Sequence, residues 1–148
     1  TVSLDVGWHE QWLTDPGLPR VLSGLDLFFP NESEGQCITG ESEPEKILDW
    51  FSRAGLRRAV LKLGARGAAV LWDGEIIYDP PPRVTPVDTT GAGDAFNAGF
   101  LHSWLRGESP GICLRAGNIC GAFSTEAYGG VAGVPAADRL KELLNTQS

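Results

Sequence analysis

The residues best suited to chemistry form the segment Asp88-Thr89-Thr90-Gly91-Ala92-Gly93-Asp94, which runs into an apolar stretch with helical periodicity over residues 95–105. The periodicity predicts a helix, and the three small residues in the segment leave the N–H groups at its start unshielded. Because these donors and the positive end of the helix dipole both favour negative charge, the segment predicts an anion site. A carboxylate beside that anion indicates phosphoryl transfer, in which Asp94 accepts the proton of an attacking hydroxyl.

A second interpretation of the same residues needs no chemistry. In it, Thr90 caps the helix and Asp94 is a surface acid that the helix dipole favours. Two other phosphate motifs are excluded: a dinucleotide fingerprint would need glycine where Phe96 stands, and a P-loop would need a Gly-Lys-Ser or Gly-Lys-Thr tripeptide, which the chain lacks. The chemical interpretation is therefore a glycine loop that works without a P-loop lysine.

Composition predicts a globular domain. The 148 residues, 42% hydrophobic and 21% charged, are enough for one domain with a real core. The net charge of −7 argues against nucleic acid or an anionic membrane as a partner, and no apolar run reaches the roughly 20 residues of a membrane span. Three cysteines without Cys-x-x-Cys spacing indicate neither zinc nor disulfides, so a cytoplasmic protein is expected, with Cys113 and Cys120 as core residues of a helix.

Residues 88–94 form what we call the anion segment. Alternating strands and helices must position it. Apolar runs predict strands at residues 2–6, 25–29 and 59–63, the first of them buried. A short helix should follow Asn31, and a capping box from Ser42 to Glu45 should open a second helix that ends at Gly55. This alternation predicts a mainly parallel α/β sheet, in which ligands gather at the carboxyl ends of the strands.

The second half of the chain should hold a hairpin and two further helices. Asp73-Gly74 predicts a tight turn between strands at residues 68–72 and 75–78, and three prolines from Pro80 predict an extended segment. Ser109-Pro110 should start a helix with apolar positions as far as residue 127, followed by a glycine-rich loop at 128–133. A last helix should open at Pro135.

The anion segment, continued by Ala98-Gly99-Phe100-Leu101, closely resembles the C-terminal signature of the ribokinase-like (PfkB) carbohydrate kinases. Asn31-x-x-Glu34, Lys62-Leu63-Gly64-Ala65-Arg66-Gly67, Asn118 and the Gly129-Gly130 loop follow the order of that family. The resemblance spans essentially the whole chain but only the second half of the family pattern. It implies a three-layer αβα sandwich, of which residues 1–148 are the C-terminal, nucleotide-binding part, without the lid and most of the sugar site.

The resemblance also assigns roles to residues. It implies that Asp94 is the general base and that Gly91, Ala92 and Gly93 donate N–H groups to the transferring phosphoryl group. It implies further contacts, which we list together: Asn31 and Glu34 organise Mg²⁺ partly through water, Lys62, Gly64, Gly67 and Asn118 contact the nucleotide, and Asp88, Thr90, Gly129 and Gly133 correspond to a K⁺ site of many relatives.

Each of these roles has a structural alternative. Asn31 could cap a helix and leave Glu34 in solvent, Asp88 could accept backbone N–H groups within a turn, and Asn118 could serve only the packing of its helix. The stretch Asp5-Val6-Gly7-Trp8-His9 departs from the Asp-x-Asn-x-Arg pattern of relatives that act on acidic sugars. That departure puts a sugar-acid substrate in doubt.

The resemblance implies a kinase that uses ATP and Mg²⁺, with K⁺ as a further expectation, to phosphorylate a hydroxymethyl group of a sugar or nucleoside. The alternatives are a nucleotide-binding regulatory module without catalysis and a kinase of a vitamin or pyrimidine alcohol. We expect the chain alone to be inactive. We also expect it to form a homodimer or to associate with a missing N-terminal half.

Overall fold

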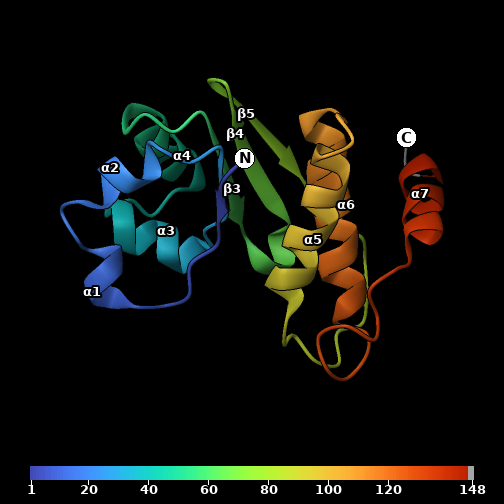
Figure 1. The fold of residues 1–148 in the computed structure, drawn as a ribbon. Helices are drawn as coiled ribbons and strands as arrows, with labels where there is room; N and C mark the ends of the chain where they lie inside the picture. The colour runs from blue at the N-terminus through green and yellow to red at the C-terminus, as the bar shows by residue number, and fades with distance from the viewer. Residues whose placement is uncertain (147–148) are drawn as a thin grey trace. The chain divides into compact units, whose positions relative to one another are not determined.

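The computed structural model describes residues 1–146, and the chain forms two compact units. The first unit contains residues 1–64 and 68–78, and the second contains residues 65–67 and the chain from Asp79 onward. Figure 1 follows the elements of both units in chain order.

A mixed sheet of five strands, in the order β1-β2-β3-β4-β5, organises the first unit. The first three strands are parallel, as the alternation of strands and helices predicts, and β4 is antiparallel to β3. Asp73 and Gly74, with φ of 49° and 97°, form the predicted tight turn between β4 and β5. The strands are β1 (Ser3–Leu4), β2 (Leu27–Phe28), β3 (Arg58–Lys62), β4 (Ala68–Trp72) and β5 (Glu75–Asp79), whose last residue belongs to the second unit.

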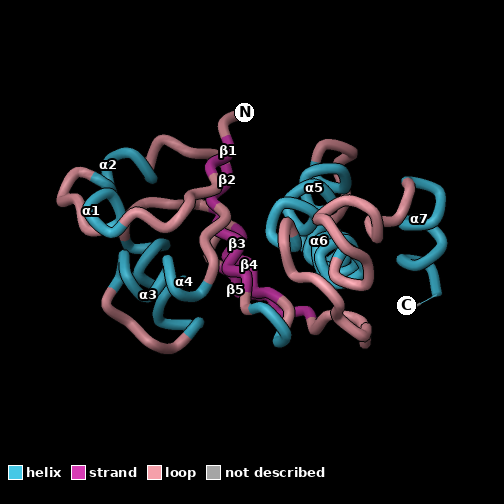
Figure 2. Tube along the Cα trace, turned by 90° about the horizontal axis from the view of Figure 1, so that it is seen from below, coloured by secondary structure: helices cyan, strands magenta, loops and turns pink. Residues whose placement is uncertain are grey.

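Four helices of the first unit lie to one side of its strands (Figure 2). They are α1 (Glu10–Leu13), α2 (Leu18–Leu22), α3 (Glu32–Thr39) and α4 (Pro44–Arg53). Helix α4 buries Ile47 and Phe51 in the same apolar cluster as Leu61 of β3. The rings of Phe28 and Phe51 pack edge to face, with their centroids 5.4 Å apart. This core fixes the carboxyl ends of the parallel strands, where candidate site residues lie.

Two local predictions in this unit are wrong. The first strand is only two residues long and lies at the edge of the sheet, with Ser3 exposed, so it is not a buried strand. Helix α4 begins at Pro44 after Glu43, which makes no side-chain cap, so the expected capping box from Ser42 to Glu45 does not form. Proline at the first helical position needs no N–H acceptor and has a helical φ, which makes a side-chain cap less necessary.

Helices α5 (Ala92–Trp104), α6 (Pro110–Ser124) and α7 (Ala137–Thr146) belong to the second unit (Figure 1). Glycines bring α5 and α6 together: a Cβ on Gly99 would lie 2.5 Å from the carbonyl oxygen of Ala116, and one on Gly117 would lie 2.9 Å from the ring of Phe96. Helix α6 starts as predicted, because the Ser109 hydroxyl accepts the N–H of Ile112 at 3.5 Å. The short 3₁₀ turn η1 (Gly64–Arg66) precedes β4.

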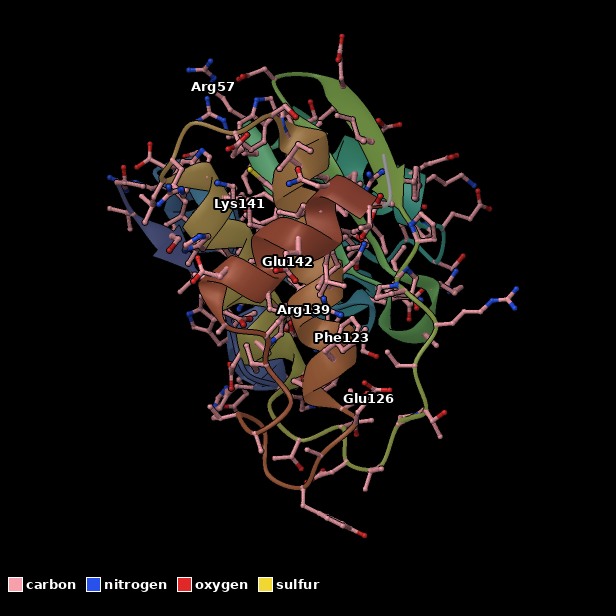
Figure 3. The ribbon with its side chains drawn as sticks, turned by 90° about the vertical axis from the view of Figure 1, so that its right-hand side faces the viewer. Arg57, Phe123, Glu126, Arg139, Lys141 and Glu142 are labelled. Carbon is pink, nitrogen blue, oxygen red and sulfur yellow. The ribbon has the colours of Figure 1, made fainter. Side chains whose placement is uncertain are left out.

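Helix α7 packs through one face and is polar on the other. Leu140 is buried in a cluster with Ile119 and Cys120 of α6. Arg139, Lys141 and Glu142 of α7 are exposed and labelled in Figure 3, and Arg139 and Glu142 form an ion pair at 2.9 Å. Within residues 1–146, no helix is both long and apolar enough to cross a bilayer.

Candidate functional site

Residues predicted for the site occur on both units. Asn31, Glu34, Lys62 and Gly64 lie on the first unit, at or just beyond the carboxyl ends of β2 and β3. Gly67, Asn118 and all predicted residues from Asp88 to Asp94 and from Gly129 to Gly133 lie on the second. Each of the two groups of residues has its own geometry within its unit.

On the first unit, Asn31 and Glu34 form a capping box at the start of α3. The side-chain oxygen of Asn31 accepts the N–H of Glu34 at 2.9 Å, and Oε2 of Glu34 accepts the N–H of Asn31 at 2.8 Å. The structural alternative is therefore right for Asn31, which does cap the helix. It is wrong for Glu34, whose side chain is buried instead of solvated, with 2% of its surface exposed.

The buried carboxyl of Glu34 keeps one oxygen available. Its Oε2 accepts the N–H of Asn31, whereas its second oxygen, Oε1, takes no part in the capping box. Burial raises the pKa of Glu34 above its usual value, while the N–H of Asn31 and the charge of Lys62 act in the opposite direction. An acid with a spare oxygen in this position is suited to a ligand that brings positive charge.

Lys62, the last residue of β3, forms an ion pair that the sequence analysis does not predict. Its Nζ lies 2.9 Å from Oδ2 of Asp5, which directly follows β1. The lysine side chain is 13% exposed and the aspartate side chain 32% exposed. The pair spans two strands, because the carboxyl ends of the parallel strands β1, β2 and β3 lie at one edge of the sheet.

The donors on this edge fit Mg²⁺ bound largely through water. Mg²⁺ prefers oxygen ligands, retains several waters and needs only one or two carboxylates. Asn31 and Glu34 supply an amide oxygen and a carboxylate, and within residues 1–146 no group of three or more His, Cys, Asp or Glu residues is placed to hold a metal by itself. Asn31 and Glu34 would hold the ion, and other oxygens would come from water or nucleotide.

On the second unit, the start of α5 presents free backbone donors. Within the described chain, the N–H groups of Gly91, Gly93 and Asp94 have no acceptor, whereas that of Ala92 donates to the carbonyl of Thr89 at 3.2 Å. The helix has no side-chain cap, so the alternative in which Thr90 caps it is wrong. Gly91 is the N-cap residue and has φ of 73°, which glycine adopts without strain. Asp94 is exposed in the first turn beside these donors.

On the same unit, the carboxylate of Asp88 connects the anion segment to the loop that contains Gly129. Oδ1 accepts the N–H of Thr90 at 2.9 Å, and Oδ2 accepts the N–H of Gly129 at 2.9 Å. These bonds, first that from Gly129, lower the pKa of Asp88. The turn role predicted as an alternative is therefore confirmed for Asp88, and its role as a K⁺ ligand stays a prediction.

Three glycines have steric reasons for their identity. A Cβ on Gly130 would lie 2.7 Å from the carbonyl oxygen of Thr90 and 2.9 Å from Cα of Gly91, so the loop after α6 touches the anion segment. A Cβ on Gly133 would collide with the carbonyl oxygen of Phe123, and one on Gly67 with that of Asp79. Gly64 faces open space. Close packing therefore explains why residues 67 and 133 are glycines. The contacts of Gly67 with nucleotide and of Gly133 with K⁺ stay predictions.

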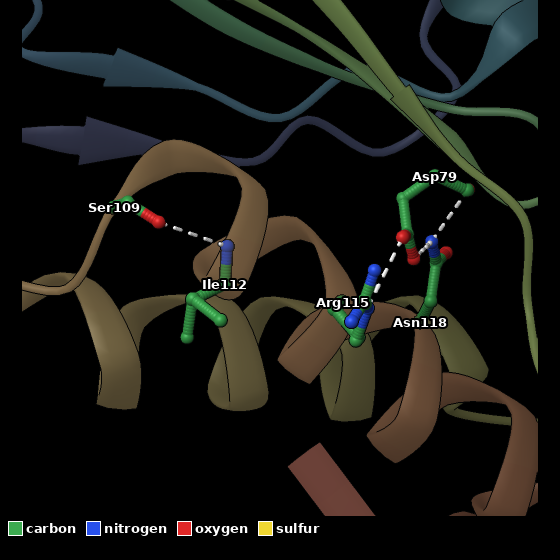
Figure 4. A network of polar contacts seen from close by, with 5 residues as sticks. All are labelled: Asp79, Ser109, Ile112, Arg115 and Asn118. Carbon is green, nitrogen blue, oxygen red and sulfur yellow. Dashed lines mark hydrogen bonds and ion pairs between the residues drawn. The ribbon is translucent and has the colours of Figure 1, made fainter. Parts of the chain in front are cut away.

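Asn118 takes part in a buried polar network on α6 (Figure 4). Its Nδ2 donates to the backbone oxygen of Asp79 at 2.7 Å and to Oδ2 of Asp79 at 3.0 Å, while Arg115 Nε donates to Oδ1 at 3.3 Å. Both amide hydrogens of Asn118 are thereby used. Asn118 thus has the structural role that was the alternative to nucleotide binding. No signal in the sequence identifies Asp79 as its partner.

The sequence and the fold of this chain match those of sugar kinases. Residues 2–137 match the pfkB family of carbohydrate kinases, and the chain belongs to that family. A 2-dehydro-3-deoxygluconokinase of Bacillus subtilis (strain 168) is 37% identical over 85% of this chain and 40% of its own length. A ribokinase of Arabidopsis thaliana is 31% identical over 97% of this chain and 38% of its own length. The chain thus spans about 40 to 50% of such curated relatives.

Solved structures agree on the ribokinase-like α/β fold. The Arabidopsis ribokinase complexed with ribose and ATP matches 96% of this chain and 46% of its own, with a TM-score of 0.83 and 30% identity. An E. coli protein provisionally named ribokinase II, in complex with ATP and Mg²⁺, matches 95% of this chain and 46% of its own, with a TM-score of 0.80 and 26% identity. The predicted family and fold class are therefore confirmed.

Proposed function

We propose that this chain is the nucleotide-binding part of a kinase that transfers the terminal phosphoryl group of ATP to a hydroxymethyl group of a sugar or nucleoside. The observation that carries the proposal is the free N–H groups of Gly91, Gly93 and Asp94 at the start of a 13-residue helix. Donors fixed in this way stabilise charge that develops on a migrating phosphoryl group. Family membership and the ATP complexes of two relatives support the same nucleotide.

In the proposed reaction, Asp94 accepts the proton of the acceptor hydroxyl. Support for this role comes from its location, since Asp94 lies in the first turn of α5, adjoins the free amides in sequence and is exposed. Asp88 holds the anion segment next to the loop at Gly129, because its carboxylate accepts an N–H from each of them. We assign Lys62, Gly64, Gly67 and Asn118 to nucleotide contacts and Asp88, Thr90, Gly129 and Gly133 to a monovalent-cation site on family resemblance alone.

Mg²⁺, when bound with ATP, would neutralise phosphate charge during transfer. Asn31 and Glu34 are the residues proposed to hold it. Glu34 contributes its free oxygen, and Asn31 fixes the direction of the carboxylate through the N–H that Oε2 accepts. The capping box therefore serves both the helix and the proposed site.

Two acceptor classes follow from the relatives. Ribose is supported by the ribokinase matches, and a sugar acid by the 37% identity to a 2-dehydro-3-deoxygluconokinase, although the segment from Asp5 to His9 lacks the Asn and Arg of the acidic-sugar pattern. A panel of ribose, deoxyribose, 2-dehydro-3-deoxygluconate and a nucleoside distinguishes them.

The test is ATP-dependent ADP release and product phosphorylation, measured for the chain alone and for the chain joined to the amino-terminal part of the Arabidopsis ribokinase. We expect Mg²⁺·ATP to bind both proteins by calorimetry, and turnover only in the joined protein. Binding without turnover in the joined, folded protein would favour a regulatory nucleotide-binding module. Absence of nucleotide binding in both would contradict the proposal.

A further inference from the structure

Three consecutive parallel strands bring opposite charges to one edge of the first unit. Asp5 follows β1, Asn31 and Glu34 follow β2, and Lys62 ends β3. Lys62 and Asn31 form an isolated parallel β-bridge, in which the N–H of Lys62 donates to the carbonyl of Pro30 at 2.9 Å. Strand β2, which leads into the helix that carries Glu34, therefore lies between β3, which ends at Lys62, and β1, which precedes Asp5.

The Lys62 ammonium has two carboxylates within its electrostatic reach. Asp5 is two strands away from β3, roughly 10 Å at ordinary strand spacing, yet Lys62 Nζ reaches its Oδ2 at 2.9 Å. Lys62 makes no ion pair within 4.0 Å of Glu34 among residues 1–146, although its charge acts on that carboxyl. Lys62 thus pairs with the outer carboxylate of Asp5, and Oε1 of Glu34 lies outside the capping box that occupies Oε2.

We propose that Asp5 is a positioning residue that holds the Lys62 ammonium away from Glu34 and so keeps the Glu34 carboxylate open to a divalent cation. The inference rests on the proposed function, because it concerns the same metal-binding edge. A lysine without Asp5 would turn to another carboxylate of the same edge, since burying an unpaired charge is costly. The charge of Lys62 already acts on Glu34, and an ammonium beside that carboxylate would repel the cation.

A double-mutant cycle tests this role in the protein that carries these residues. The variants are Asp5→Asn, Lys62→Met and the pair together, with Asp49→Asn as the control that removes an exposed acid of α4 from the same unit. The readout is the affinity of Mn²⁺ with ATP, measured by electron paramagnetic resonance, and it needs no turnover. Thermal unfolding of each variant checks that it is folded.

We expect Asp5→Asn to weaken Mn²⁺ binding about tenfold, which corresponds to about 1.4 kcal/mol, and Asp49→Asn to leave it unchanged. In the Lys62→Met background, Asp5→Asn should have little effect, because the competing ammonium is gone. Equal losses in both backgrounds would mean that Asp5 acts only as a nearby negative charge, which overturns the inference. A parent that binds no Mn²⁺ with ATP would overturn the proposed function itself, so the two failures are distinguishable.

Discussion

Asn31 and Glu34 bond to each other twice, each side chain accepting the backbone N–H of the other residue at 2.8 to 2.9 Å. The two bonds begin α3 directly after β2 and bury a carboxyl that has 2% of its surface exposed. Only one of its oxygens is needed for the capping box. The helix start and the proposed metal site thus share one acid, and the two roles can be separated by changing its charge without changing its shape.

Glu34→Gln should separate them. Burial raises the pKa of Glu34, so the folded chain holds this proton more tightly than the unfolded chain, and stability falls as the pH rises through the folded pKa. Glutamine keeps an oxygen that can accept the N–H of Asn31, and its side chain does not ionise. We expect the variant to be more stable than the parent at about pH 8 and no more stable near about pH 4, in denaturant titrations.

The exposed acid Glu45 in the first turn of α4 provides the control, since Glu45→Gln should show no such pH-dependent gain. Glu34→Gln should at the same time lose Mn²⁺ binding in the presence of ATP. A variant that is less stable than the parent at about pH 8, where the parent carboxyl is ionised, would show that the charged carboxylate stabilises the fold.

Asp94→Asn tests the proposed general base. The side chain is exposed at the start of α5, so the substitution should leave thermal unfolding nearly unchanged. Turnover in the protein joined to a relative's amino-terminal part should fall by about 10²- to 10⁴-fold, the usual contribution of a general base, while ATP affinity is retained. Asp138→Asn, in the first turn of α7, is a matched control. Turnover within a few-fold of the parent would remove Asp94 from the mechanism.

The sequence predicts the fold well because its signals are local. Apolar runs and turn residues give β2 to β5, Asp73-Gly74 gives the hairpin, and Ser109-Pro110 gives the start of α6. It fails at the first strand, because apolar residues at a sheet edge have the same pattern as buried ones. It also predicts a capping box at Ser42 that does not form, because α4 begins at Pro44, whereas the cap at Asn31 does form.

The candidate site is less predictable than the fold. The anion segment is recognisable, because small residues before a periodic stretch leave a helix start bare. The ion pair of Lys62 with Asp5 and the bonds of Asn118 to Asp79 join residues 57 and 39 positions apart. No spacing rule relates such distant side chains, so these contacts are found only when the chain is folded.

Gly121→Ala tests whether α6 supports the anion segment. A Cβ at this position would lie 3.1 Å from the carbonyl oxygen of Ala92 and 3.2 Å from Cβ of Phe96, so the first turn of α5 must shift slightly. Gly111→Ala, at the second residue of the same helix, meets no atom within 4 Å and should change the free energy of unfolding by less than about 0.5 kcal/mol. We expect calorimetry to show weaker ATP binding only for Gly121→Ala. Equal ATP affinity in both variants would contradict a supporting role.

The cysteines should differ in reactivity toward iodoacetamide. Burial raises the pKa of Cys113 and of Cys120 to about 11, so both remain thiols at neutral pH, whereas Cys37 is partly exposed. We expect mass spectrometry of the folded chain to find Cys37 alkylated first. Denaturant should make all three react, which controls for accessibility. Early labelling of Cys113 or Cys120 would show that the α5–α6 pair opens readily.

Asn118→Ala should destabilise the second unit because it leaves buried polar groups of Asp79 without their donors. The loss of a buried hydrogen-bond partner costs about 1–3 kcal/mol, so the free energy of unfolding should fall by that amount. Asn145→Ala, an exposed position on α7, should change it by less than about 0.5 kcal/mol. Denaturant titration measures both variants. A large fall in ATP affinity for Asn118→Ala without a matching fall in stability would instead place Asn118 in contact with the nucleotide.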